Sequence, residues 1–227
     1  RIDRDSTARK GALEAELQAI RQGKSQILIG TQMLAKGHHF PNVTLVAIVN
    51  VDSALFSTDF RSEERLAQLY LQVAGRAGRA EKPGEVVLQT HYPDHPLLKV
   101  LLNEGYEAFA QSALQLRQTM QLPPFCAQAL FRATGKHNEQ IANFLQNLTA
   151  YFQQKTVELG LQGMQILPPF SAPMPKKAGA YRWLLLIQHH SRRLLQQLLA
   201  QFEQDKANFA IPSSIRLSLD VDPLEWN

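Results

Sequence analysis

The chain has 227 residues, of which 44% are hydrophobic, with a formal net charge of +4 and a single cysteine, Cys126. This length allows one large domain or two modest ones, and the composition is ordinary for a globular protein. No apolar run approaches the roughly 18 residues of a membrane helix. The lone cysteine excludes a disulfide framework and a cysteine-rich zinc site, and it favours a reducing cytoplasm. The small positive charge permits a nucleic-acid partner without requiring one.

The first part of the chain predicts alternating helices and strands. Helical spacing or amphipathic character predicts helices at 7–22 and 61–74, and short apolar runs predict strands at 26–30, 44–51 and 85–91. Strands that alternate with helices are typical of a parallel sheet covered on both faces. We therefore expect an α/β fold here, corresponding to the second half of a RecA-like lobe.

The second part predicts a different arrangement. Residues 97–120 are expected to be helical, and Leu122-Pro123-Pro124-Phe125 ends that helical stretch. The rest reads as strand 127–134, helix 138–159, strand 164–170, strand 180–188, helix 192–206 and strand 214–221. This βαββαβ order is that of a ferredoxin-like α+β domain. The predicted organisation is thus a helicase-type lobe segment at 1–96, a helical linker at 97–125 and a second domain at 126–227.

The segment 68–79, QLYLQVAGRAGR, is the most informative stretch of the chain. Arg76 and Arg79 are three residues apart, so on a helix end they would lie on one face. Gly75 and Gly78 would let another backbone approach beside them. Two fixed guanidinium groups suit the charge that develops on a transferring phosphoryl group, which is the role of an arginine finger. Gln72 completes the cluster.

The chain contains no G-x-x-x-x-G-K-[ST] loop and no Asp-Glu-x-His tetrad, which are the parts that would hold phosphates and Mg²⁺. It also begins with Arg1 and not with methionine. We therefore expect it to be the carboxyl-terminal fragment of a longer motor protein, inactive as an ATPase by itself.

A second cluster follows the predicted strand 26–30. Thr31 comes directly after the apolar run, and Gly37 follows six residues later. Loops at the carboxyl ends of parallel strands are where such folds bind ligands. The Thr31 hydroxyl and backbone N–H would suit a nucleic-acid phosphate. The alternative is an ordinary strand–turn with a buried hydroxyl.

Taken together, these segments resemble a known family. ILIGTQMLAKGHHFPNVTLV resembles motif V of superfamily 2 helicases, and QVAGRAGR resembles motif VI. With ALFSTDFRSEER between them, the chain is similar to the PriA family of replication-restart helicases, and the resemblance extends through LPPF to the terminal LDVDP. It implies an ATP- and Mg²⁺-dependent DNA helicase that remodels forked DNA and loads the primosome in the bacterial cytoplasm.

The resemblance also implies roles for individual residues. Arg76 and Arg79 would contact the nucleotide phosphates, with Arg79 as the finger, and Gln72 would position the attacking water or the γ-phosphate. Gly37 would permit close approach to ATP. His39 stands where many relatives have an aspartate that meets the ribose, so that contact differs here.

Further contacts implied by the family concern DNA and metal. Thr31 would touch the DNA backbone. The family's zinc-bearing cysteine insertion would precede Arg1, so no metal site is expected within these residues. The pairs His38-His39 and His91/His95 lack a recognisable third ligand and are expected to be surface or capping residues.

The second predicted domain contains a basic window without any acidic residue, 159–202. Strand alternation also places Phe131, Ile215, Leu217 and Leu219 toward the helices. Arg132 and Arg216 then lie on the opposite face of the sheet. The corresponding family domain resembles ribosomal protein S10 and engages DNA, so we expect this face to bind phosphates and stacked bases. The alternative is a solvated face with Tyr181 and Trp183 in the core. The DNA-binding candidates are Arg132, Lys176, Lys177, Tyr181, Arg182, Trp183 and Arg216.

Arg192 and Gln196 lie one turn apart on the last predicted helix. Arginine binds carboxylates bidentately, so this pair could hold an acidic peptide. The resemblance implies the acidic tail of single-stranded DNA-binding protein, alongside forked and single-stranded DNA and other primosome proteins, as partners. An exposed helix face without a partner is the alternative. For the whole protein, an adaptor without enzymatic activity and a RecG-like translocase remain open.

Overall fold

The computed structural model describes residues 18–20, 22, 27–30, 43–57, 59–75, 84–206 and 209–226. The chain divides into two compact units, residues 1–110 and 111–227, and each is considered separately. Within the described ranges, no helix is both long enough and apolar enough to cross a membrane.

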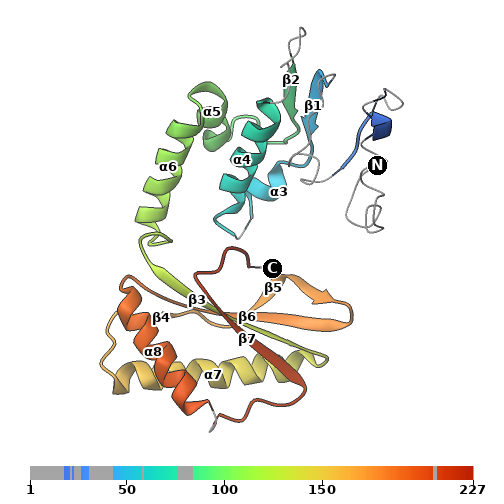
Figure 1. The fold of residues 1–227 in the computed structure, drawn as a ribbon. Coiled ribbons are helices and arrows are strands. Elements are labelled where there is room, and N and C mark those ends of the chain that lie inside the picture. Colours follow the sequence, from blue (N-terminus) through green and yellow to red (C-terminus); the bar gives the residue numbers. More distant parts are fainter. Residues whose placement is uncertain are drawn as a thin grey trace. The chain divides into compact units, whose positions relative to one another are not determined.

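The first unit contains a parallel pair of strands, β1 (Leu45–Ile48) and β2 (Glu85–Leu88). Between them the chain forms the short helix α3 (Asp52–Leu55) and the longer helix α4 (Ser62–Ala74), as Figure 1 shows. Two parallel strands need a crossover connection, and α4 provides it. The predicted α/β character and parallel pairing of this part are confirmed.

Only one face of this strand pair is packed. Val51, Leu55 and Leu66 form a small core with Leu98, and residues on the same side of β1 and β2 pack against it. On the other side, Leu45 is 58% exposed and the alternating positions of both strands are open. The expectation that both faces are covered is therefore wrong for the described part of this unit.

The predicted strand 26–30 is also not formed over its described residues. Residues 27–29 are irregular, and Gly30 makes a single bridge. Ile27 and Ile29 are 81% and 63% exposed. An apolar run of this kind becomes a strand when neighbours satisfy its backbone and cover its side chains, and the described residues do not supply that cover. The predicted helix 7–22 lies mostly outside the described residues.

The helical stretch predicted at 97–120 is two helices, α5 (Pro96–Asn103) and α6 (Tyr106–Thr119). Proline occupies the start of α5, where its missing N–H costs no hydrogen bond. Gly105 separates the helices with a φ of 88°, a conformation that favours glycine.

The second unit has the order β3 (Ala127–Gly135), α7 (Asn138–Glu158), β4 (Gln165–Ile166), β5 (Phe170–Lys177), β6 (Ala180–His189), α8 (Arg192–Asp205) and β7 (Ile215–Val221). The sheet order is β4-β6-β3-β7, with β5 also paired to β6, and all these pairs are antiparallel. The strand predicted at 164–170 ends early, at β4, because Pro168 and Pro169 cannot donate ladder hydrogen bonds, and β5 is an additional strand that was not predicted.

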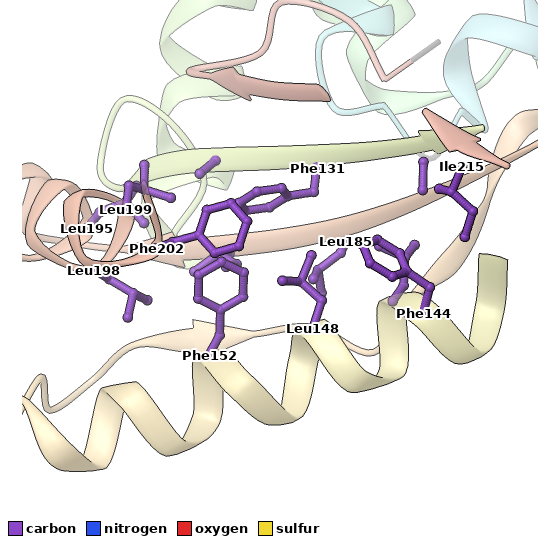
Figure 2. Packing of buried hydrophobic residues seen from close by; sticks show 14 of the residues in the cluster. Phe131, Phe144, Leu148, Phe152, Leu185, Leu195, Leu198, Leu199, Phe202 and Ile215 are labelled. Atoms are coloured by element: carbon purple, nitrogen blue, oxygen red, sulfur yellow. The ribbon is translucent and has the colours of Figure 1, made fainter. Parts of the chain in front are cut away.

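Helices α7 and α8 pack on one face of this sheet, where the main core lies (Figure 2). Phe131 of β3 is fully buried, with its ring centroid 5.2 Å from that of Phe152 on α7 and 5.4 Å from that of Phe202 on α8. Ile215 and Leu185 extend the cluster along neighbouring strands. The predicted inward side of the strands is confirmed for Phe131 and for Ile215, Leu217 and Leu219.

The opposite face of the sheet is partly covered as well. Leu130, Leu184 and Leu186 form a second cluster with Ala172 of β5, and Trp226 packs against it. Next to this cluster, three glutamines form a row across β3, β6 and β4. Gln128 Nε2 donates to Gln188 Oε1 at 2.9 Å, and Gln188 Nε2 donates to Gln165 Oε1 at 2.6 Å.

Candidate functional site

The structure describes one residue of the predicted nucleotide site. Gln72 lies in the last turn of α4, where its side chain is exposed. The other predicted residues of this site, Gly37, His39, Arg76 and Arg79, lie outside the described residues, as does Thr31, the predicted DNA contact. Their roles therefore stay predictions.

The start of α4 is held by a buried aspartate that the sequence analysis did not single out. Asp59 is 6% exposed and accepts a hydrogen bond from the backbone N–H of Arg61 at 3.1 Å. Its other carboxylate oxygen lies 2.6 Å from Arg65 Nη2. A buried carboxylate that is both hydrogen-bonded and ion-paired is held in one position. Asp59 therefore anchors the start of α4, the helix that carries Gln72.

A second aspartate ties together the carboxyl ends of β1 and β2. Asp52 accepts a hydrogen bond from the Thr90 hydroxyl, and its other oxygen lies 3.1 Å from His91 N and 2.7 Å from His91 Nδ1. The hydrogen bond from Thr90 is the main reason why the pKa of Asp52 is lowered, and His91 lowers it further. An aspartate directly after an apolar strand was the available sequence signal.

In the second unit, a row of three residues crosses the sheet on the face away from α7 and α8. Thr134 of β3 is paired with Arg182 of β6 on one side and with Arg216 of β7 on the other. Residues opposite one another in antiparallel strands share a face. Neighbouring strands lie about 4.8 Å apart, so the backbones of the two arginines are separated by about 10 Å.

A pocket of about 230 Å³ opens at this row. Arg132 also belongs to it, but its charge is already compensated, because Nη1 lies 2.7 Å from Asp220 Oδ2 and Nη2 donates to the carbonyl of Glu225. Among the described residues, Arg182 and Arg216 have no acidic partner. The lining residues are Arg132, Thr134, Arg182, Trp183, Leu184, Arg216 and Ser218.

The predicted DNA-binding residues do not all lie on one face. Tyr181 and Trp183 pack against the main core on the face that carries the helices. Trp183 Nε1 donates to Asn138 Oδ1 at 2.8 Å, and Lys176 Nζ lies 4.7 Å from the Tyr181 ring centroid. This packing is the arrangement of the alternative, with Tyr181 and Trp183 at the core, although Trp183 also lines the arginine pocket. Base stacking by these two residues stays a prediction. Lys177 is exposed near the turn between β5 and β6.

The predicted partner-binding pair lies at the start of α8. Arg192 and Gln196 are both exposed, one turn apart. The Arg192 guanidinium forms an ion pair with the carboxylate of Asp222. The Arg192 guanidinium, which was expected to bind an acidic peptide, is thus already paired with a carboxylate of the same chain.

No group of three or more His, Cys, Asp or Glu side chains suited to a metal ion occurs among the described residues. Of the predicted surface histidines, His91 and His95 lie within the described residues, and each ring contacts a neighbouring side chain. His91 pairs with Asp52, and the His95 ring lies edge-on to Phe56 at a centroid distance of 5.9 Å.

Comparison with known proteins identifies two regions in the chain. Residues 5–81 match the helicase conserved C-terminal domain, and residues 118–224 match the primosomal protein N C-terminal domain. The first region includes both predicted helicase motifs, and the second includes the arginine pocket. These two matches define the C-terminal portion of a helicase-type protein.

Relatives along nearly the whole chain are more specific. Replication restart protein PriA of Haemophilus influenzae is 64% identical over 98% of the chain, which corresponds to 30% of that protein. The PriA proteins of Synechocystis and Bacillus subtilis are 37% and 35% identical over 99% and 98% of the chain, or 26% and 27% of their own lengths. The chain belongs to the PriA family, and it spans less than a third of the length of these relatives.

Proposed function

We propose that this chain is the C-terminal part of an ATP-dependent superfamily 2 DNA helicase that remodels forked DNA and loads the primosome during replication restart. The observation that carries the proposal is the succession of a helicase C-terminal match and a primosomal-protein match in one chain. The relatives bear the name of a replication restart protein, which supports the same assignment.

In this proposal the first unit supplies one side of an ATP site. Arg76 and Arg79 stabilise the charge on the transferring phosphoryl group, and Gln72 orients the attacking water. Gly37 and His39 meet the nucleotide, and Thr31 holds a DNA phosphate. The phosphate loop and the Mg²⁺ ligands belong to the other lobe. Changes in lobe closure during ATP hydrolysis then move the bound strand.

The second unit is proposed to be a ferredoxin-like, S10-like DNA-binding domain. The strand order β4-β6-β3-β7 with both helices on one face supports this assignment, with β5 as an addition to the βαββαβ pattern. Arg182 and Arg216 give it a positive surface on the face without helices, which also carries Arg132, paired with Asp220. The exposed Lys177 is paired in register with Ala180 and shares this face.

ATP hydrolysis tests the divided site. We expect no measurable DNA-stimulated ATPase from the 227-residue chain, and DNA-stimulated ATPase with fork unwinding from the full-length protein that contains it. Sustained turnover by the chain alone would contradict a shared two-lobe site. Fork binding by the full-length protein without hydrolysis would instead favour the adaptor function.

A partner that ends in acidic residues, such as the tail of single-stranded DNA-binding protein, is proposed to bind Arg192 and Gln196. Because Arg192 is ion-paired with Asp222, such a peptide must displace the Asp222 carboxylate from Arg192. We expect Asp222→Asn to strengthen binding of an acidic peptide by about two- to fivefold, the value of one exposed ion pair, and Arg192→Ala to weaken it. Fluorescence anisotropy with a labelled peptide measures both effects.

The matched control is Asp94→Asn, because Asp94 is an exposed carboxylate of the first unit that pairs with Lys99 at 2.8 Å. It makes the same charge change elsewhere and should leave peptide affinity unchanged. Equal effects of the two aspartate variants would show that only net charge matters and that Arg192 is not the site.

A further inference from the structure

We propose that Arg182 and Arg216 form a phosphate clamp for the sugar–phosphate backbone of bound DNA, with the strand crossing β6, β3 and β7 over Thr134. This inference rests on the proposed DNA-binding function of the second unit and assigns the binding to particular groups. It replaces the broader set of basic and aromatic residues expected from the sequence.

Charge compensation selects these two arginines from the basic residues of the pocket. Arg132 is held by Asp220 and by the Glu225 carbonyl, so its hydrogen-bonding groups are directed within the protein. Arg182 and Arg216 have no acidic partner among the described residues. Two uncompensated guanidinium groups that face one pocket bind anions well, because each presents a planar fork of donors to phosphate oxygens.

The geometry of the row suits a polyanion. The two arginines flank Thr134, whose hydroxyl lies between them in the register, and their backbones are about 10 Å apart. Long, flexible side chains at this separation can hold one phosphate together or two consecutive phosphates. Thr134 and Ser218 line the same pocket and add neutral donors.

The placement of the aromatic side chains indicates what is not recognised here. Tyr181 and Trp183 are packed against the helix-covered core, and Phe170 and Trp226 pack with the second apolar cluster. Trp183 is the aromatic residue that lines the pocket, and its ring is packed against the main core with Nε1 held by Asn138. The clamp therefore reads the backbone and not the base, so binding should be independent of sequence.

The decisive experiment is a salt titration of the 227-residue chain with a single-stranded oligonucleotide of mixed sequence. Each phosphate contact contributes about 0.7 to the slope of log K against log salt concentration for a single strand. We expect Arg182→Ala/Arg216→Ala to reduce that slope by about 1.4 and to weaken binding at low salt by about tenfold or more per arginine. Both positions lie outside the apolar core, so the variant should stay folded.

Two further variants separate the clamp from general charge. Arg193→Ala, an exposed arginine of α8 outside the pocket, makes the same type of change and should have little effect. Arg182→Lys/Arg216→Lys keeps both charges but removes the planar fork, so the slope should be retained while affinity falls.

A chemically altered ligand gives an independent readout. Methylphosphonate linkages remove the phosphate charge without removing the base. Replacing phosphates with these linkages should weaken binding of the unaltered chain more than binding of the double-alanine variant, because the variant has already lost two phosphate contacts.

The outcomes distinguish this inference from the function on which it rests. If the unaltered chain binds no DNA, the proposed DNA-binding role of the second unit fails. If the chain binds DNA but Arg182→Ala/Arg216→Ala behaves like Arg193→Ala, the role stands and the clamp is overturned.

Discussion

Arg79→Ala in the full-length protein is expected to lower kcat by on the order of 10³–10⁵ while changing the nucleotide Kd far less. An arginine finger acts on charge that develops in the transition state, so its removal leaves ground-state binding largely intact. Single-turnover ATP hydrolysis with saturating DNA measures the chemical step, and equilibrium binding of a labelled nucleotide measures Kd.

Arg79→Lys should not restore turnover, because an ammonium group lacks the planar fork of guanidinium. The matched control is Arg193→Ala, which removes an exposed arginine from the second unit. Near-normal kcat in either Arg79 variant would remove this residue from the ATP site.

The second large effect concerns stability. Phe131→Ala is expected to lower the free energy of unfolding of the second unit by about 3–5 kcal/mol. Phe131 is fully buried, and its ring packs against both Phe152 and Phe202, so truncation leaves a cavity between the sheet and both helices. Val157→Ala is the control, because Val157 is 81% exposed on α7 and its truncation should change little.

Urea denaturation followed by tryptophan fluorescence measures this loss selectively. The chain has two tryptophans, Trp183 and Trp226, and both lie in the second unit. A loss below about 0.5 kcal/mol for Phe131→Ala, typical of a surface substitution, would show that the packing of Phe131 against Phe152 and Phe202 does not carry the stability of this unit.

The second unit was largely predictable from the sequence because its strands and helices pair and pack with one another within residues 111–227. The alternation of Ile215, Arg216 and Leu217 correctly separated the core face from the polar face. Alternation failed in β6, where Leu184–Ile187 is apolar at every position and is buried on both sides. Pattern alone could not decide there which face would receive Tyr181 and Trp183.

Ion pairs between residues far apart in the sequence were the main feature that the sequence did not predict. Arg132 and Asp220 are separated by 88 positions, and their contact depends on β7 lying beside β3 in a particular register. The same holds for Arg192 and Asp222, which are 30 positions apart. Sequence reasoning recognised these arginines as candidate sites but could not show that acidic residues already engage them.

The first unit shows a different limit. The apolar run at 26–30 has the composition of a buried strand, yet burial depends on partners that composition does not reveal. The spacing of Gln72, Arg76 and Arg79 predicts that they act on a nucleotide phosphate, but it does not give the distances between their side chains. The residues of the nucleotide site were therefore assigned mainly from the family resemblance, whereas those of the arginine pocket were assigned mainly from the structure.

The glutamine row of the second unit has a consequence for the uniqueness of the fold. Buried amides stabilise less than apolar side chains of similar size, but they penalise wrong pairings more heavily. Sliding β6 by one residue would turn Gln188 toward the phenylalanine cluster and leave the amides of Gln128 and Gln165 without their partner. Strand β4 has only two residues, too few to define its own position by backbone pairing. The three glutamines thus specify the register of the strands, and they exclude misaligned sheets at some cost in the free energy of unfolding.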